Sequence, residues 1–226
     1  MTYTLKACGN IAEIGQESWD ACANPAVRDP DCGVPFDPFL SYAFLHALEQ
    51  SESACPQTGW APYHIAFEDD AEGVLGVVPM YLKSHSQGEY VFDHSWADAL
   101  ERAGGRYYPK LQVAVPFTPA TGRRLLTKPA PNVPDLENYL LGGVMKMAEN
   151  LSVSSVHVTF SDRSQWERMG ELGFLQRTHK QFHWQNEGYA SFDDFLAALS
   201  SKKRKNIRRE RRDAVEAGIE IEWVTG

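Results

Sequence analysis

The fold is decided by three apolar runs between residues 111 and 186: LQVAVPF (111–117), SSVHVTF (154–160) and FLQRTHKQFHWQN (174–186). Each run is rich in the β-branched and aromatic residues that favour strands. The first two are short and continuous, which is typical of buried strands. The third alternates apolar or aromatic residues with polar ones, which predicts a strand with one exposed face.

The segments between these runs have the spacing of helices. Residues 136–151 repeat apolar residues at helical intervals, and Asp135 precedes them in the position of an N-cap. SQWERMGELGF (164–174) predicts a shorter helix that closes on Gly173. Alternating strands and helices predict an α/β fold with a mixed central sheet flanked by helices.

The residues before this core predict a helix and a hairpin. FDPFLSYAFLHALEQ (36–50) has apolar residues at helical spacing, and Ser41 offers an N-cap oxygen. The runs 61–69 and 73–83 flank the turn-forming residues EDDAEG, so we expect an antiparallel hairpin that ends near Lys83. Pro79 lacks a backbone N–H, which places an edge or a bulge there.

A second unit is predicted from residue 188 onward. Ser191 and Asp194 have the spacing of a capping box before FDDFLAALS, and a basic helix follows from Ser201 to Gly218. IEIEWV (219–224) predicts a half-exposed strand. We therefore expect one repeat at 1–187 and the opening helix and strand of a second at 188–226, the alternative being a last strand added to the first sheet.

The charge is concentrated at one place. The chain carries a net charge of −8, yet residues 201–212 (SKKRKNIRRERR) hold eight Lys or Arg and one Glu, which is +7 and leaves −15 for the rest. An acidic body with one basic segment favours a local anion site and argues against binding of duplex DNA.

The sequence also bears on compartment and metal content. No apolar run reaches the roughly 18 to 20 residues that span a bilayer, and MTYTLKACGN lacks the features of a signal peptide, so we expect a cytoplasmic protein without a transmembrane segment. The four cysteines include no C-x-x-C pair, and H-E-x-x-H does not occur. We expect reduced thiols and no metal.

The segment from Leu111 to Trp184 resembles the core of the GNAT acyltransferase superfamily, in which a strand runs into a phosphate-cradling turn and a helix. The Gly173-Phe174 pair lies where that core expects it. The superfamily's Gly-rich pyrophosphate turn is not matched, since only Gly122 and Arg123 remain near Thr121. Pro116 and Pro119 also lack the N–H groups that such a cradle would use.

A more specific resemblance begins at Phe36. PFLSYAFLHALEQS, YLKSHSQGEYVFDHSWADA, YYPKLQVAVPFTP and SKKRKNIRRERR are similar to the FemAB-like proteins of peptidoglycan biosynthesis or recognition. These resemble the Fem-type aminoacyltransferases, which are built from two GNAT-like repeats and move an amino acid from aminoacyl-tRNA to a cell-wall precursor. The resemblance implies that this chain is the N-terminal portion of such a protein.

The motif that contributes most to this resemblance is K-x-R-x-N-I-R, at residues 202–208. In Fem-type enzymes its arginines are associated with the phosphates of the precursor. Independently, Arg204 and Arg208 share one helical face, and two guanidinium groups can hold a diphosphate. A solvated helix surface and nonspecific RNA contact remain alternative interpretations.

A second candidate site lies in residues 81–112. Its polar and aromatic groups suit either a pocket for a sugar or nucleobase, or a packed loop. We expect Lys83, Tyr108 and Lys110 to line an acceptor groove, and Asp93 or His94 to accept the amine proton, with burial raising the pKa of the aspartate. The segment holds Tyr81, Lys83, His85, Glu89, Tyr90, Asp93, His94, Trp96, Tyr107, Tyr108, Lys110 and Gln112.

Together these features predict an acyl- or aminoacyl-transferase that acylates a substrate amine, with a cell-wall precursor as one candidate acceptor. Acyl-CoA and aminoacyl-tRNA are both open as the co-substrate, so tRNA is a candidate partner. The alternative is a non-catalytic module that recognises a phosphorylated precursor or RNA. The sequence specifies no oligomeric state.

Overall fold

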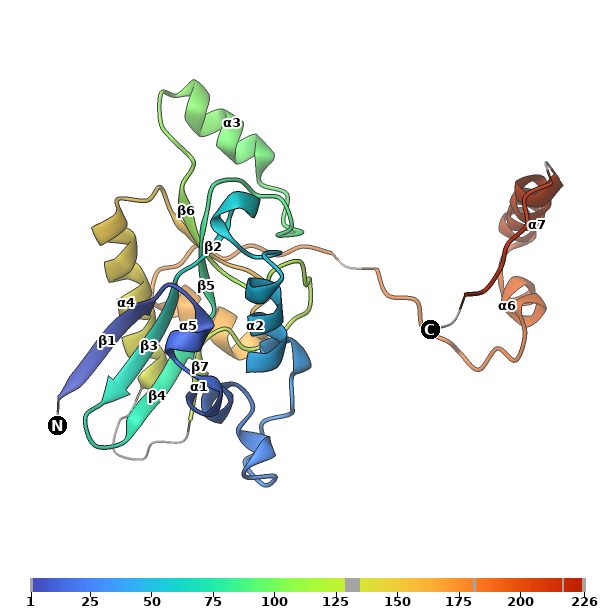
Figure 1. Ribbon diagram of the computed structural model, residues 1–226. Coiled ribbons are helices and arrows are strands. Elements are labelled where there is room, and N and C mark those ends of the chain that lie inside the picture. The colour runs from blue at the N-terminus through green and yellow to red at the C-terminus, as the bar shows by residue number, and fades with distance from the viewer. Residues whose placement is uncertain (1, 129–134, 181, 217, 225–226) are drawn as a thin grey trace. The chain divides into compact units, whose positions relative to one another are not determined.

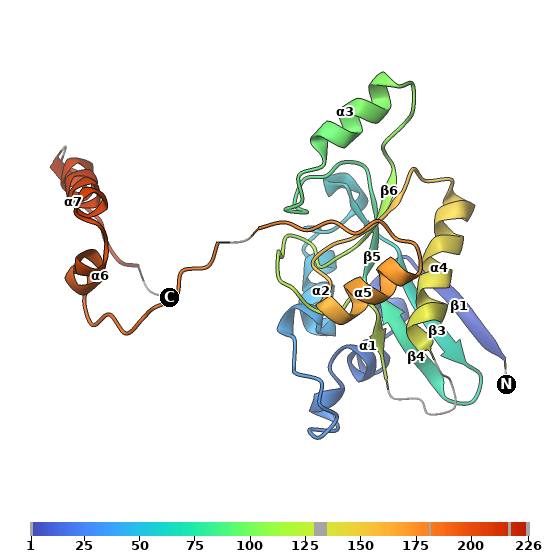
Figure 2. The same cartoon turned by 180° about the vertical axis from the view of Figure 1, so that it is seen from behind.

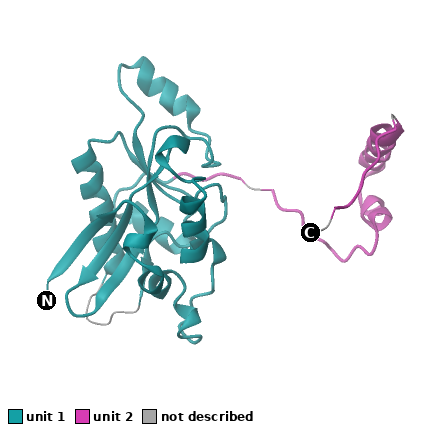
Figure 3. Cartoon of the chain, in the orientation of Figure 1, with its two compact units in different colours: residues 1–176 teal, residues 177–226 magenta. Residues whose placement is uncertain are grey.

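The computed structural model describes residues 2–128, 135–180, 182–216 and 218–224. The chain forms two compact units, residues 1–176 and 177–226 (Figure 3). The boundary predicted between the two repeats, at 187/188, lies within the second unit and stays a prediction.

The first unit holds all the strands of the described residues and five of the α-helices. The predicted helices at 36–50, 136–151 and 164–174 all form, although the first of them begins only at Tyr42. The helices are α1 (Gln16–Ala23), α2 (Tyr42–Gln50), α3 (His94–Arg102), α4 (Leu136–Leu151) and α5 (Arg163–Glu171). The strands are β1 (Tyr3–Cys8), β2 (Trp60–Pro62), β3 (His64–Asp69), β4 (Gly73–Val78), β5 (Met80–Lys83), β6 (Lys110–Val113), β7 (Leu126–Thr127) and β8 (Val156–Val158).

These strands form two four-stranded sheets, in the orders β1-β3-β4-β7 and β2-β5-β6-β8. The predicted hairpin is the antiparallel pair β3/β4, and its second run breaks at Pro79 before it continues as β5. The strand pair stays connected across this break, because Tyr63 N donates to Met80 O over 2.8 Å. β6 and β8 are parallel and all other pairs are antiparallel, so the predicted mixed α/β sheet is confirmed.

Helices cover both faces of the β1-β3-β4-β7 sheet (Figures 1 and 2). Ile65 and Phe67 belong to one core cluster with Leu140 of α4. Ala66, between them, belongs to the other cluster, with Trp19 of α1 and Leu45 of α2. This alternation is the period-two pattern of a strand buried on both faces.

The helix caps follow the prediction in part. Ser41 caps α2 by accepting a hydrogen bond from Phe44 N. The capping predicted for Asp135 is wrong: its backbone is left-handed, and no side-chain cap bond forms. Its carboxylate instead accepts a hydrogen bond from Arg168 on α5, because Oδ1 lies 2.8 Å from Nη2. Asp135 therefore links α4 to α5.

Two predicted strands do not form. In the described parts of 174–186 and in 219–224 the chain is extended but joins no ladder. The side chains of Phe182 and Trp223 are 97% and 92% exposed. A strand is stabilised by a paired neighbour and by burial of one face. Apart from Phe174, which packs against the core of the first unit, the described residues of these segments are exposed and pair with no strand.

The second unit consists of α6 (Phe192–Ala198) and α7 (Ser201–Glu216) with the segments around them. The predicted capping box forms, because Asp194 N donates to Ser191 Oγ and Ser191 N donates to Asp194 Oδ2. The basic segment is the helix α7, as predicted.

Candidate functional site

One face of the β2-β5-β6-β8 sheet carries a band of polar and aromatic side chains. Trp60 pairs with Lys83, and Lys83 pairs with Lys110, so these three form a row across β2, β5 and β6. Directly opposed residues share a face. Two residues along, Tyr81 pairs with Gln112, and Gln112 pairs with His157 of β8.

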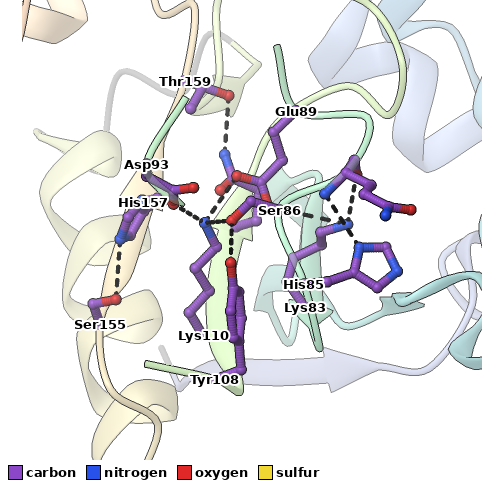
Figure 4. A network of polar contacts seen from close by, with 12 residues as sticks. Lys83, His85, Ser86, Glu89, Asp93, Tyr108, Lys110, Ser155, His157 and Thr159 are labelled. Carbon is purple, nitrogen blue, oxygen red and sulfur yellow. Dashed lines mark hydrogen bonds and ion pairs between the residues drawn. The ribbon is translucent and has the colours of Figure 1, made fainter. Parts of the chain in front are cut away.

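Residues 84–109 contribute the side chains that cover this face. The segment leaves the sheet at the end of β5 and returns to it at the start of β6, and it includes α3. In Figure 4, Ser86, Glu89 and Asp93 surround the end of the Lys110 side chain. We call the face and these covering groups the polar cluster: Lys83, Ser86, Glu89, Asp93, Tyr107, Tyr108, Lys110, Gln112 and His157.

Lys110 is the centre of the polar cluster. Its Nζ donates to Ser86 Oγ, Glu89 Oε2 and Asp93 Oδ2 over 2.9, 2.8 and 2.6 Å. The side chain is fully buried, as are those of its two carboxylate partners to within 1%. An ammonium has three donors, so Lys110 is saturated by the protein and holds the covering segment on the sheet.

Lys83 has a weaker set of partners. Its Nζ lies 3.5 Å from the centre of the Trp60 ring, donates to Gln87 O over 3.2 Å, and is 4.0 Å from Glu89 Oε1. Burial lowers the pKa of Lys83 to about 7, against the opposing effect of Glu89. Near neutral pH a substantial fraction of Lys83 is therefore the neutral amine, which can accept a proton.

Asp93 has a pKa opposite to the expected one. Burial alone raises it, but hydrogen bonds, led by that from Lys110, lower the pKa of Asp93 to about 2. Tyr107 Oη also donates to Asp93 Oδ2 over 2.7 Å. The predicted upward shift is wrong because the sequence does not show the donors that stabilise the carboxylate.

The pKa of Glu89 is shifted in the opposite direction to that of Asp93. Burial raises its pKa, although Lys110 and Lys83 act against this. Only Oε2 bonds to Lys110. Two carboxylates a few residues apart thus have pKa values shifted in opposite directions.

The structure brings four of the predicted site residues together and separates the others. Lys83, Asp93, Tyr108 and Lys110 lie in the polar cluster, where Tyr108 Oη is 2.7 Å from Ser86 Oγ. His94 is exposed at the start of α3. The imidazole near Asp93 is that of His157, whose Nδ1 lies 4.0 Å from Asp93 Oδ2.

His157 is the residue that the sequence analysis missed. Its Nε2 is 3.0 Å from Ser155 Oγ and 3.5 Å from Tyr107 Oη. Its side chain is 17% exposed, which makes it the solvent-facing end of a chain of polar contacts that runs through Asp93 to Lys110. The alternation of VHV in a predicted strand placed His157 on one face of the sheet, but no local signal identified its partners.

Arg204 and Arg208 lie on α7 in the second unit and contact α6. Arg204 Nη2 donates to Ala197 O and Leu199 O over 3.2 and 3.0 Å, at the C-terminal end of α6. Arg208 Nη2 lies 3.4 Å from Asp193 Oδ1. The two guanidinium groups therefore share one helical face, as predicted, and this face is turned toward α6.

The turn Thr118–Arg124 is occupied by internal bonds. Gly122 N donates to Phe160 O over 3.0 Å. Arg124 is buried and donates to three carbonyl groups, those of Ala120, Arg123 and Thr159. These donors stabilise the turn and are not directed at a ligand, in agreement with the unmatched pyrophosphate pattern.

Among the residues whose placement is described, no three His, Cys, Asp or Glu side chains are grouped so that they could hold a metal ion. The helices of this part of the chain also include none with the length and apolar character of a membrane span.

The first unit is thus a mixed α/β fold whose β2-β5-β6-β8 sheet carries a buried, charged face. The FemAB-like family, described as peptidoglycan biosynthesis/recognition, matches residues 10–226. The chain belongs to this family. Among curated proteins none matches.

The chain is also similar to solved acetyltransferase structures. An acetyltransferase of Trypanosoma brucei is 12% identical, with 82% of this chain and 99% of that chain covered and a TM-score of 0.45. A ribosomal-protein-alanine N-acetyltransferase of Brucella melitensis biovar Abortus is 10% identical, with 82% and 100% covered and a TM-score of 0.46. An aminoglycoside 6'-N-acetyltransferase of Acinetobacter baumannii is 13% identical, with 83% and 100% covered and a TM-score of 0.43.

Proposed function

We propose that the chain belongs to an acyl- or aminoacyl-transferase that acylates a substrate amine, with a cell-wall precursor as the candidate acceptor. Its membership of the FemAB-like family over residues 10–226 supports this class. The observation that carries the proposal is the polar cluster, where a buried lysine with a pKa of about 7 lies beside a buried carboxylate.

The chemistry requires an amine that has lost a proton. Its nitrogen attacks the acyl carbon, a C–N bond forms, and the bond from that carbon to the donor's sulfur or oxygen breaks. The donor then leaves as a thiol or an alcohol after taking a proton. A base is needed because a free amine is mostly protonated at neutral pH, and a base works best when its pKa lies near the working pH.

The pKa values favour Lys83 over Asp93 as the proton acceptor. Asp93, with a pKa of about 2, is a poor proton acceptor at neutral pH and is better suited to orient Lys110. Lys83, with a pKa of about 7, matches the requirement. We therefore assign the role of proton acceptor to Lys83. Asp93 and His94 are the candidates that the sequence alone predicts for this role.

The alternative, a recognition module without catalysis, is favoured by a different observation. The turn at Thr118–Arg124 uses its donors internally, so it supports no phosphate cradle. A module that binds a phosphorylated precursor or RNA through α7 would not need such a cradle.

An assay of product separates the two functions. The full chain is incubated with acetyl-CoA or with aminoacyl-tRNA and a panel of primary amines that includes a cell-wall precursor, and amide products are measured by mass spectrometry. A transferase yields a product whose mass increases by the acyl group. Lys83→Met should remove at least about 90% of this product, since a general base contributes roughly a hundredfold or more.

Lys146→Met is the matched control, because Lys146 is an exposed lysine on α4 whose side chain is 69% exposed. It should leave the yield unchanged. No product with any donor, together with retained binding of the precursor, would favour the recognition module and contradict the transferase.

A further inference from the structure

The polar cluster contains three buried polar atoms that have no hydrogen-bond partner among the described residues: Glu89 Oε1 and Asp93 Oδ1 of the covering segment, and Gln112 Oε1 of the sheet. The three residues are 3%, 1% and 0% exposed in this order. A buried polar atom without a partner is costly, so such atoms are rare in folded proteins.

These atoms lie on both sides of one internal boundary. Gln112 of β6 pairs with Tyr81 and with His157 and belongs to the polar face of the sheet. Glu89 and Asp93 lie in residues 84–109 and bind the same Lys110 ammonium through their other oxygens. The unpartnered atoms therefore mark the boundary between the covering segment and the sheet.

The chemistry of these three atoms requires hydrogen-bond donors. Carboxylate and amide oxygens only accept hydrogen bonds, so Glu89, Asp93 and Gln112 each require an N–H or O–H group. A primary ammonium brings three donors on one nitrogen, as many as there are acceptors in this set.

The charge of the cluster favours a cation as well. Two carboxylates face two lysines, and burial shifts Lys83 toward its neutral form above about pH 7. With Lys83 neutral, Glu89 and Asp93 carry one more negative charge than Lys110 offsets. A buried unbalanced charge is unfavourable, and a bound cation relieves it.

We propose that the boundary between residues 84–109 and the β5/β6 face is the binding site for the primary amine group of a substrate, held by Glu89, Asp93 and Gln112. This rests on the proposed function, in which that amine is the acyl acceptor. The amine reaches the site when the covering segment lifts, and Lys83 lies beside Glu89 to take its proton.

The test uses the full chain and 2-aminoethanol as the probe, with ethylene glycol as the neutral probe of the same size. Amide ¹H–¹⁵N spectra are recorded during titration of each compound at pH 8. We expect saturable shifts in residues 80–113 with 2-aminoethanol and at least about tenfold weaker binding of ethylene glycol, because hydrogen bonds to charged groups are the strong ones. Equal binding of both compounds, or shifts elsewhere only, would overturn the proposal.

Two variants are expected to change the binding of 2-aminoethanol in opposite directions, so a general loss of folding cannot explain both results. Glu89→Gln keeps an oxygen for Lys110 and replaces the free acceptor by a donor, so it should weaken binding of 2-aminoethanol about tenfold or more. Gln112→Glu adds a negative acceptor and should strengthen it. Glu101→Gln, an exposed change on α3, is the matched control and should have no effect.

The outcomes separate this inference from the proposed function. Binding of 2-aminoethanol that responds to Glu89→Gln, without amide product from any donor, supports the site and contradicts the transferase. Amide product with an apparent amine affinity that neither variant changes supports the transferase and contradicts the site.

Discussion

Lys83 and Lys110 are directly opposed across β5 and β6, yet only Lys110 has a complete set of partners. Lys110 binds one hydroxyl and two carboxylates, whereas Lys83 has one carbonyl, an aromatic ring and a distant carboxylate. We therefore expect the same residue type in this row to have two roles. Lys110 stabilises the cover of the sheet, and Lys83 is the proposed proton acceptor.

Removal of Lys110 should destabilise the first unit strongly. Lys110→Met leaves two buried carboxylates without their cation, and breaking a buried pair in this way costs about 3 to 5 kcal/mol. The free energy of unfolding from urea titration measures this loss. Lys146→Met should change the same quantity by less than about 0.5 kcal/mol, and an equal effect of both substitutions would show that Lys110 is not central.

Lys83 should make stability depend on pH on the alkaline side. Its pKa is about 7 when folded and about 10.4 in an unfolded chain, so between these values the unfolded state binds more protons. The free energy of unfolding contributed by Lys83 therefore rises with pH from about 7 to 10. Against Lys83→Met, the wild type should gain relative stability over this range, and a constant difference would contradict the lowered pKa.

Asp93 should contribute on the acid side. Its folded pKa of about 2 lies below the ordinary value of about 3.9, so its stabilisation is present above pH 4 and is lost as pH falls toward 2. The loss amounts to about 2 to 3 kcal/mol. Asp93→Asn should lack this part of the acid transition, whereas Asp98→Asn, an exposed change on α3, should retain it.

Substitution of the α7 arginines tests whether they bind phosphate or only connect α7 to α6. If Arg204 and Arg208 hold the phosphates of a precursor, replacing both by Ala should lower affinity for a phosphorylated sugar-peptide precursor in calorimetry by about tenfold or more. Unchanged affinity would contradict the clamp and leave their contacts with α6 as their role.

RNA contact by α7 would give a different signature. The affinity for tRNA would then fall steeply between about 50 and 200 mM salt, because bound counterions are released from the nucleic acid. A site for a small phosphorylated molecule would lose much less over the same range.

Local patterns predicted most of the first unit. The helices at α2, α4 and α5 follow from apolar spacing, and the β3/β4 hairpin follows from two apolar runs around a polar turn. The described residues of 174–186 and the segment 219–224 have strand patterns without strand structure, since pairing depends on a neighbour that a local pattern does not report.

The site was predicted in its residues more than in its geometry. Lys83, Asp93, Tyr108 and Lys110 follow from the density of polar groups in one segment. His94 is the sequence-based candidate next to Asp93, whereas β6/β8 pairing brings His157, which the sequence does not single out, to the cluster. The pKa direction of Asp93 depends on donors from distant strands, which the sequence does not order in space.

The most direct test is a crystal structure of the chain with 2-aminoethanol bound at pH 8. We expect its nitrogen within about 3 Å of Glu89 Oε1, Asp93 Oδ1 or Gln112 Oε1, with Lys83 beside it. An amine bound only at the exposed surface, with the covering segment unchanged, would contradict an amine site under residues 84–109.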